Sequence, residues 1–235
     1  MPSLVRRVKT FLGRIDRRVF PPQESLDALL RAAIAPDCSS VLDVGCGQGG
    51  SLLRRVPLLP FSVGVDLHLP PEDPDVPRHS GYVEADILAL DERFSPGTFD
   101  CVVALDVVEH LERPEGLRLL GSMERIAARR VIVLTPNGFL PQPPTPDNPH
   151  QEHISGWTVE DFTARGYRVL GVNGWKPLRG MYGLIRLEPV GFWLRVSILT
   201  QSFTERHPRQ AFQLLAVKDV GDDTASRRPD SHSPQ

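Results

Sequence analysis

The sequence predicts an α/β protein with a mainly parallel, doubly wound sheet, and three observations support this fold class. Short apolar segments of strand length alternate with segments whose apolar residues recur at helical spacing. Several of the short segments are continuously apolar, as expected for strands that are buried on both faces. Glycines or acidic residues follow their carboxyl ends, where such sheets bind ligands. We therefore expect function to lie in the loops at that edge of the sheet.

The composition is that of an ordinary globular protein. The chain has 235 residues, of which 40% are apolar and 24% charged, with 27 Lys+Arg against 29 Asp+Glu and a net charge of −2. These values exclude a chain that is disordered throughout and a collagen-like chain. The near-zero net charge also argues against a general nucleic-acid-binding protein, so no nucleic-acid partner is expected.

The cysteines and the lack of a long apolar run predict a cytoplasmic protein. Cys38, Cys46 and Cys101 are an odd and sparse set, which is typical of free thiols in a reducing compartment. No run approaches the roughly 18–20 apolar residues that span a bilayer. The first nine residues lack the uninterrupted apolar core of a secretion signal.

Residues 1–22 have the pattern of a basic amphipathic helix that ends at Pro21-Pro22. One interpretation is that its apolar stripe packs on the domain. The other is that it contacts a membrane surface or a partner, which would place the protein close to a membrane. The apolar positions are Leu4, Val8, Phe11, Leu12, Ile15 and Val19, and the basic ones are Arg6, Arg7, Lys9, Arg14, Arg17 and Arg18.

The main domain is expected to cover residues 23–218. Its first helix contains the apolar residues of 26–34 and ends at Pro36, and a later helix begins near Pro114. The apolar face of the later helix is expected to consist of Leu117, Leu120, Met123 and Ile126. Strands are expected at residues 41–44, 61–66, 81–87, 99–105 and 131–134.

The pattern changes after Pro136. Prolines recur through residues 140–150 and exclude a helix or a central strand there. Thr158 followed by Asp161 predicts a capped short helix. The remaining segments are expected to be a strand at 167–172, a helical cap insertion at 174–208, a last strand at 211–217 and a disordered tail at 219–235.

The strongest local signal is a glycine loop directly after the first strand. Its glycines satisfy two spacings: Gly45, Gly47 and Gly50 match a dinucleotide loop, whereas Gly45, Gly47 and Gly49 form G-x-G-x-G. The following helix is stopped early by Pro57, which disfavours a pyrophosphate at its N-terminus. Asp43 beside the turn would repel a pyrophosphate but suits a ligand that carries an ammonium group.

Here the chain resembles the class I S-adenosylmethionine-dependent methyltransferases, which have a Rossmann-like fold. The resemblance covers roughly residues 38–172. The matching motifs are Asp43-x-Gly45-x-Gly47-x-Gly49, Asp66 after the second strand, Ala85-Asp86-Ile87 after the third, and Phe99-Asp100 at the fourth. The resemblance implies that the glycine loop wraps the methionine part of the cofactor, that Asp66 binds the ribose, and that Asp86 holds the adenine amine. The implied cofactor-binding residues are Asp43, Gly45, Cys46, Gly47, Gly49, Asp66, Leu67, Asp86, Ile87 and Leu105.

Acids and histidines near the predicted cofactor site are candidates for activating a methyl acceptor. Asp106 and Glu109 would share one face of a helical turn after the fourth strand, with His110 adjacent, and His153 lies on a later loop at the same edge. Together they could bind Mg, Mn, Fe or Zn, which would lower the pKa of an acceptor hydroxyl. His153 as a general base without metal, and substrate binding or helix capping, are the alternatives.

A second resemblance concerns this candidate metal site. Small-RNA 2′-O-methyltransferases and ubiquinone-pathway O-methyltransferases carry Glu-x-x-Glu-His after the fourth strand and a later His as metal ligands. The matching residues here are Asp106-x-x-Glu109-His110 and His153. Asp106 departs from the pattern because it is one methylene shorter than the Glu of those families.

The expected function is S-adenosylmethionine-dependent O-methylation of a small-molecule or lipid- or glycan-linked hydroxyl. An RNA acceptor is not expected, because only the N-terminal segment is strongly basic. Two other functions stay open from the sequence. They are an NAD(P)-dependent oxidoreductase, which the spacing Gly45-x-Gly47-x-x-Gly50 allows, and a non-catalytic module that binds S-adenosylmethionine.

Overall fold

The computed structural model describes most of the domain that was predicted from the sequence. The predicted helix at 1–22, Gly49, and the tail from residue 222 onward lie outside the described residues. The described residues are 26–35, 37–47, 51–57, 59–69, 78–144 and 149–221.

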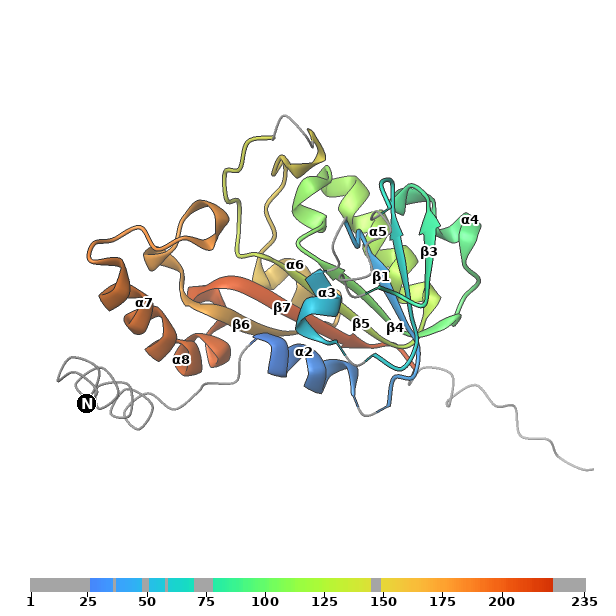
Figure 1. The fold of residues 1–235 in the computed structure, drawn as a ribbon, viewed down its shortest axis with the longest axis horizontal. Coiled ribbons are helices and arrows are strands. Elements are labelled where there is room, and N and C mark those ends of the chain that lie inside the picture. The colour runs from blue at the N-terminus through green and yellow to red at the C-terminus, as the bar shows by residue number, and fades with distance from the viewer. Residues whose placement is uncertain are drawn as a thin grey trace, which may run out of the picture.

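The described residues form one seven-stranded sheet with the order β3-β2-β1-β4-β5-β7-β6 (Figure 1). The pairs among β1 to β5 are parallel, and β7 is antiparallel to both of its neighbours, so the predicted mainly parallel α/β fold is confirmed. The strands are β1 (Val41–Val44), β2 (Ser62–Asp66), β3 (Gly81–Glu84), β4 (Phe99–Leu105), β5 (Ala127–Pro136), β6 (Arg168–Trp175) and β7 (Ala211–Asp219). β7 thus includes Asp219, which the sequence had placed in the tail.

Helices begin where the sequence supplies start signals. Pro114 occupies the first turn of α5, and Thr158 and Asp161 form a capping box at the start of α6. The α-helices are α2 (Leu26–Ile34), α3 (Ser51–Arg55), α4 (Leu90–Arg93), α5 (Arg113–Ile126), α6 (Val159–Thr163), α7 (Val190–Leu199) and α8 (Gln201–Arg206). Short 3₁₀ segments are η1 (Ile87–Ala89), η2 (Val108–His110), η3 (Pro149–Gln151), η4 (Lys176–Leu178), η5 (Met181–Gly183) and η6 (Pro208–Gln210).

Apolar layers cover both faces of the sheet. Alternation along β4 sends Val102 and Ala104 into one core with α5 and α6, and Cys101 and Val103 into the other with α2 and α3. Leu117 was expected on the apolar face of α5, but it is exposed. The buried positions of α5 are Gly116, Leu119, Leu120, Met123 and Ile126.

Trp157 connects the loop that carries His153 to the first core. Its side chain is fully buried, and its indole N–H donates to the carbonyl of Val108 (3.1 Å) and to the Ser155 hydroxyl (3.1 Å). The Arg113 guanidinium lies 4.1 Å from the ring centroid and is paired with Asp161. These contacts hold the 153–157 segment against η2, which carries Glu109 and His110.

The close contact between α5 and Trp157 predicts a difference between two glycines of one helix. A Cβ at Gly116 would overlap the Trp157 ring, whereas a Cβ at Gly121 would meet nothing within 4 Å. We expect Gly116→Ala to lower the free energy of unfolding by about 1–3 kcal/mol because the core must shift. Gly121→Ala should raise it by about 0.5–1 kcal/mol through helix propensity. Urea unfolding of both variants measures this, and equal effects would contradict the packing described here.

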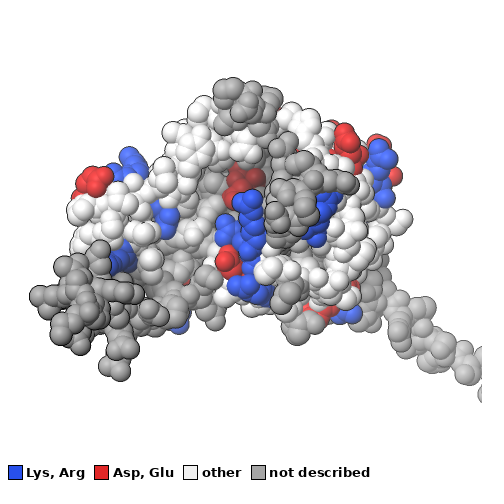
Figure 2. Space-filling model, viewed as in Figure 1, with Lys and Arg blue, Asp and Glu red and all other residues white. Residues whose placement is uncertain are grey.

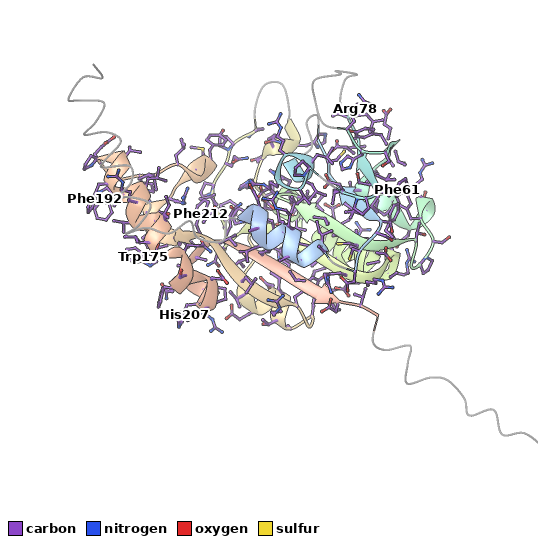
Figure 3. All side chains as sticks on the ribbon, turned by 60° about the horizontal axis from the view of Figure 1, so that its bottom comes forward. Phe61, Arg78, Trp175, Phe192, His207 and Phe212 are labelled. Carbon is purple, nitrogen blue, oxygen red and sulfur yellow. The ribbon has the colours of Figure 1, made fainter. Side chains whose placement is uncertain are left out.

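The chain between β6 and β7 is mostly helical and extends from one end of the sheet (Figure 1). It contains α7 and α8, within the range where an insertion was predicted. Only Ser197 of α7 is buried, and Phe192 is exposed at the outer end of the insertion (Figure 3). No helix in the described part of the chain combines the length and the apolarity needed to cross a bilayer.

Candidate active site

Two cavities meet at the carboxyl edge of the parallel strands. The smaller has a volume of about 550 Å³ and the larger about 1060 Å³. The smaller cavity is lined by Gly45, Gly47, Asp66, Leu67, His68, Asp86, Ile87, Leu88, Asp106, Val107, His110, Leu111, His150 and Gln151. Both cavities contain Gly45, Gly47, Asp106, His110 and Gln151 in their walls. A ligand in one cavity is therefore adjacent to a ligand in the other.

The glycine loop needs two glycines for different reasons. Gly45 and Gly47 have φ angles of 69° and 60°, which disfavour other residues. A Cβ at Gly45 would lie 2.7 Å from a methyl of Val107, whereas a Cβ at Gly47 would have open space before it. The Gly47 N–H donates to Asp66 Oδ2 (2.9 Å). Gly45 thus permits packing on Val107, and Gly47 leaves the backbone accessible to a ligand.

Acidic side chains line the smaller cavity. Asp66 Oδ1 accepts from the His68 N–H (2.9 Å), and Asp86 Oδ1 accepts from the Leu88 N–H (2.8 Å). Each carboxylate retains lone pairs for a ligand, since its two oxygens accept about four hydrogen bonds. The described lining includes Asp66, Asp86 and Asp106 but no Lys or Arg. This charge suits a cationic cofactor and opposes a pyrophosphate.

Asp43 does not reach either of these cavities, so the expectation that it faces the ligand's ammonium group is not met. Its side chain is 3% exposed and lies against His79, with Asp43 Oδ2 3.1 Å from His79 Nε2. The other ring nitrogen of His79 is 2.8 Å from the Ser62 hydroxyl. Burial raises the pKa of Asp43, and the hydrogen bond to His79 opposes that rise. Asp43 therefore ties β1 to His79, which precedes β3, rather than facing a ligand.

The remaining residues expected at the cofactor are divided between the cavities. Leu67 and Ile87 line the smaller one, while Cys46 and Leu105 line the larger one. Burial raises the pKa of the Cys46 thiol to about 12, so it stays protonated and is not a nucleophile at neutral pH.

Glu109, His110 and His153 come together in the wall of the larger cavity. One potential ligand atom from each lies within 4.8 Å of the other two. The Ile154 and Ser155 N–H groups donate to the Glu109 carbonyl (3.0 and 3.1 Å), which fixes the His153 loop to η2. Residues that are 44 positions apart in the sequence are thereby held in one cluster.

Both imidazoles bond to a backbone carbonyl through the same ring nitrogen. His110 Nδ1–H donates to the Glu152 carbonyl (2.8 Å), and His153 Nδ1–H donates to the Leu140 carbonyl (2.8 Å). These bonds place the proton on Nδ1, so that Nε2 is the basic nitrogen of each ring, as in metal-ligating histidines. Burial lowers the pKa of both histidines, which favours the neutral rings that ligate metal or accept a proton.

Glu109 is a buried carboxylate with one unsatisfied oxygen. Oε2 accepts from the Thr135 hydroxyl (2.9 Å), but Oε1 has no hydrogen-bond partner among the described residues. Burial, together with the nearby charge of Asp106, raises the pKa of Glu109 well above its ordinary value. A buried acceptor without a partner is unfavourable unless a proton, a cation or a ligand satisfies it.

Asp106 is not part of this cluster, although it was expected there as a fourth ligand. Its φ angle of 54° interrupts the helical turn that would have aligned it with Glu109. Its Oδ1 accepts from Gln213 Nε2 (2.7 Å), and it lines both cavities. Enclosure in the cleft raises the pKa of Asp106 to about 6, and the charge of Arg55 opposes the rise.

Sequence reasoning missed several residues of the site. His68 and Gln151 line the smaller cavity, and Thr135 and Gln213 fix the orientations of Glu109 and Asp106. His68 lies two residues after Asp66 and could have been found as a strand-end residue. Gln213 had no local signal, because its position depends on the antiparallel pairing of β7 with β5.

A model of a methyltransferase-domain family matches residues 14–167, which is well over half of the chain. The chain belongs to this methyltransferase family. The match decides the cofactor question against a nicotinamide-dependent oxidoreductase, so this methyltransferase is an S-adenosylmethionine-dependent enzyme. No curated protein sequence matches it.

The chain is similar to several solved methyltransferase structures. A 1,6-didemethyltoxoflavin-N1-methyltransferase from Burkholderia thailandensis superposes with a TM-score of 0.50 at 18% identity, over 91% of this chain and 87% of that one. An S-adenosylmethionine-dependent methyltransferase from Archaeoglobus fulgidus gives 0.46 at 18% identity, over 89% and 99%. The methyltransferase domain of bacterial CtHen1 gives 0.48 at 16% identity, over 83% and 97%.

Proposed function

We propose that this methyltransferase transfers the methyl group of S-adenosylmethionine to a hydroxyl oxygen of a small-molecule acceptor. The observation that carries the proposal is the cluster of Glu109, His110 and His153 at a cavity wall, where one buried carboxylate oxygen has no partner among the described residues and lies near two imidazoles. Such a group of acceptors is suited to taking up a proton or holding a cation. An oxygen nucleophile needs that help, since an alcohol is a poor nucleophile until it is partly deprotonated.

The smaller cavity fits the cofactor. Its volume is within the roughly 300–1,000 Å³ of small-molecule sites. The open space before Gly47 admits a ligand against the loop backbone, and the lone pairs of Asp66 and Asp86 can accept from ribose hydroxyls and the adenine amine. The acidic lining also favours the positive sulfonium. These features support binding of S-adenosylmethionine with its methyl group toward the junction of the two cavities.

The larger cavity is the proposed acceptor site. Its lining joins the cluster to β7 and to the insertion through residues such as Arg179, Tyr182 and Phe212. In Figure 2, Lys and Arg side chains gather in the middle of the visible face, beside acidic ones. The B. thailandensis neighbour methylates the small molecule in its name, which is consistent with a small-molecule acceptor here. Peripheral membrane contact by residues 1–22 and a cytoplasmic location stay predictions.

We further propose that Glu109, His110 and His153 hold a divalent metal ion. The unpartnered Oε1 and the two Nε2 atoms form a mixed carboxylate–imidazole donor set, which suits Zn, Fe or Mn and leaves positions for an acceptor. When bound, the ion would lower the pKa of an acceptor hydroxyl. The carbonyls of Glu152 and Leu140 orient the two rings for this role. Without an ion, His153 Nε2 would accept the proton itself.

The first test is calorimetric titration of the purified protein with S-adenosylhomocysteine. We expect saturable binding of this product in the smaller cavity, because both glycine-loop backbone and acidic acceptors are in place. NADH is the control and should not bind, since its pyrophosphate would face Asp66, Asp86 and Asp106, and the described lining of the smaller cavity includes no Lys or Arg. Binding of NADH alone would overturn the cofactor assignment and the roles given to these acids.

A further inference from the structure

A third cavity, which we call the side cavity, adjoins the proposed acceptor site. Its volume is about 390 Å³. Its lining includes Phe139, Leu140, Lys176, Arg179, Arg186 and Phe212. Pro136, Leu140, Arg179 and Phe212 also line the larger cavity, so the two spaces share a wall. Figure 3 places Phe212 between the helical insertion and the rest of the molecule.

The lining of the side cavity is cationic on one side and apolar on the other. Lys176, Arg179 and Arg186 contribute its charges, and none of the described lining residues is acidic. Phe139 and Phe212, with several prolines, form the apolar part. The larger cavity differs, because Asp27 in its wall pairs with Arg55 (3.0 Å).

The backbone of residues 176–186 brings the three cations together. The Arg179 N–H donates to the Lys176 carbonyl (3.1 Å), and the Arg186 N–H donates to the Leu178 carbonyl (3.0 Å). An isolated antiparallel bridge joins Arg179 to Ile185. The fold of this loop therefore places like charges at one cavity, an arrangement that is unfavourable unless an anion offsets it.

The polar contacts of these cations are to neutral groups. Arg179 Nε donates to the Ser197 hydroxyl (3.1 Å), and its Nη1 donates to the Gly183 carbonyl (2.7 Å). The Lys176 ammonium donates to the Asn137 carbonyl. Burial lowers the pKa of Arg179, and no carboxylate in the described residues counteracts it. A half-buried guanidinium without a carboxylate is a strong binding group for an oxyanion.

We propose that the side cavity binds a phosphate or carboxylate group of the methyl acceptor. The apolar wall of Phe139, Leu140 and Phe212 fits a hydrocarbon or ring segment that connects this anion to the reacting hydroxyl. The acceptor is thus an elongated anionic amphiphile, held at one end by Arg179 and its neighbours and at the other by the Glu109 cluster. This inference rests on the proposed function for its reacting end.

The test uses hexyl phosphate and hexanoate as probes, with hexanol as the uncharged comparison. We expect calorimetry or ligand-observed NMR to show saturable binding of an anionic probe to the wild-type protein, and weaker or no binding of hexanol. Arg179→Met and Arg186→Gln should each lower the affinity for the anionic probe by about tenfold, the effect of losing one charge-assisted hydrogen bond. Arg186 is exposed, so Arg186→Gln removes a positive charge without altering buried packing.

The control is Arg93→Gln at the exposed end of α4, which should bind the probe as the wild type does. Tighter binding of hexyl phosphate than of hexanoate identifies a phosphate as the anionic group of the acceptor, and the reverse identifies a carboxylate. No saturable binding of either anion, or equal affinity in all variants, overturns the side-cavity proposal. Titration with S-adenosylhomocysteine separates the two proposals. If the protein binds S-adenosylhomocysteine but neither anion, only the side-cavity proposal is overturned.

Discussion

Replacement of Glu109 by Gln is expected to abolish divalent-metal binding while leaving cofactor binding intact. Gln keeps the volume of Glu and can still accept from the Thr135 hydroxyl, but it cannot supply the carboxylate that would bind a metal ion. The affinity for Zn²⁺ or Mn²⁺ should fall by at least about 100-fold, the upper end of what loss of an outer-shell partner causes. Calorimetric metal titration measures this, and S-adenosylhomocysteine affinity should not change.

The matched control is Glu112→Gln, three residues away at the exposed start of α5. It makes the same substitution outside the cluster, so this variant should bind metal as the wild type does. Equal metal affinity in Glu109→Gln and Glu112→Gln would show that the ion binds elsewhere. Once an acceptor is known, full activity after chelator treatment would end the metal proposal and leave His153 as the proton acceptor.

Replacement of Asp66 by Asn is expected to weaken binding of the cofactor product strongly. The carboxylate accepts from the Gly47 and His68 N–H groups and is the proposed acceptor for ribose hydroxyls. Asn keeps one oxygen acceptor but replaces the other with a donor, which opposes one of these N–H groups. We expect S-adenosylhomocysteine to bind about 10- to 100-fold more weakly, as measured by calorimetry.

The comparison variant for Asp66→Asn is Glu92→Gln, on the exposed surface of α4. It removes an acid from a helix that follows β3, and Glu92 is not among the described lining residues of the smaller cavity. Wild-type affinity in Asp66→Asn would mean that the ribose is held by other groups. An equal loss of S-adenosylhomocysteine affinity in Glu92→Gln would indicate a long-range effect of charge rather than a direct contact of Asp66 with the ligand.

The parallel part of the fold was predictable because each strand has a local signal. Apolar runs end at Asp66 and Asp86, and the glycine loop follows β1 directly, so order along the chain placed these groups at one edge. The convergence of Glu109, His110 and His153 also followed, because two loops after neighbouring strands must meet at that edge. These predictions needed only strand order and direction.

Side-chain direction was less predictable. Asp43 lies within β1, and its direction depends on His79, which approaches from the segment before β3. Asp106 departs from helical spacing because its backbone adopts a positive φ angle after β4. Neither partner contact nor this conformation has a signal in the nearby sequence. The side cavity was equally unpredictable from the sequence, since it requires the 176–186 loop to fold against β5 and β7.

The position of β7 has a consequence for biosynthesis. It is the last strand of the described chain, yet it lies between β5 and β6, and β6 pairs with no other described strand. A nascent chain that has emerged only to residue 210 therefore exposes an unpaired edge of β5 and a β6 segment without a partner. Such edges promote aggregation, so completion of the sheet must wait for the end of translation of this domain.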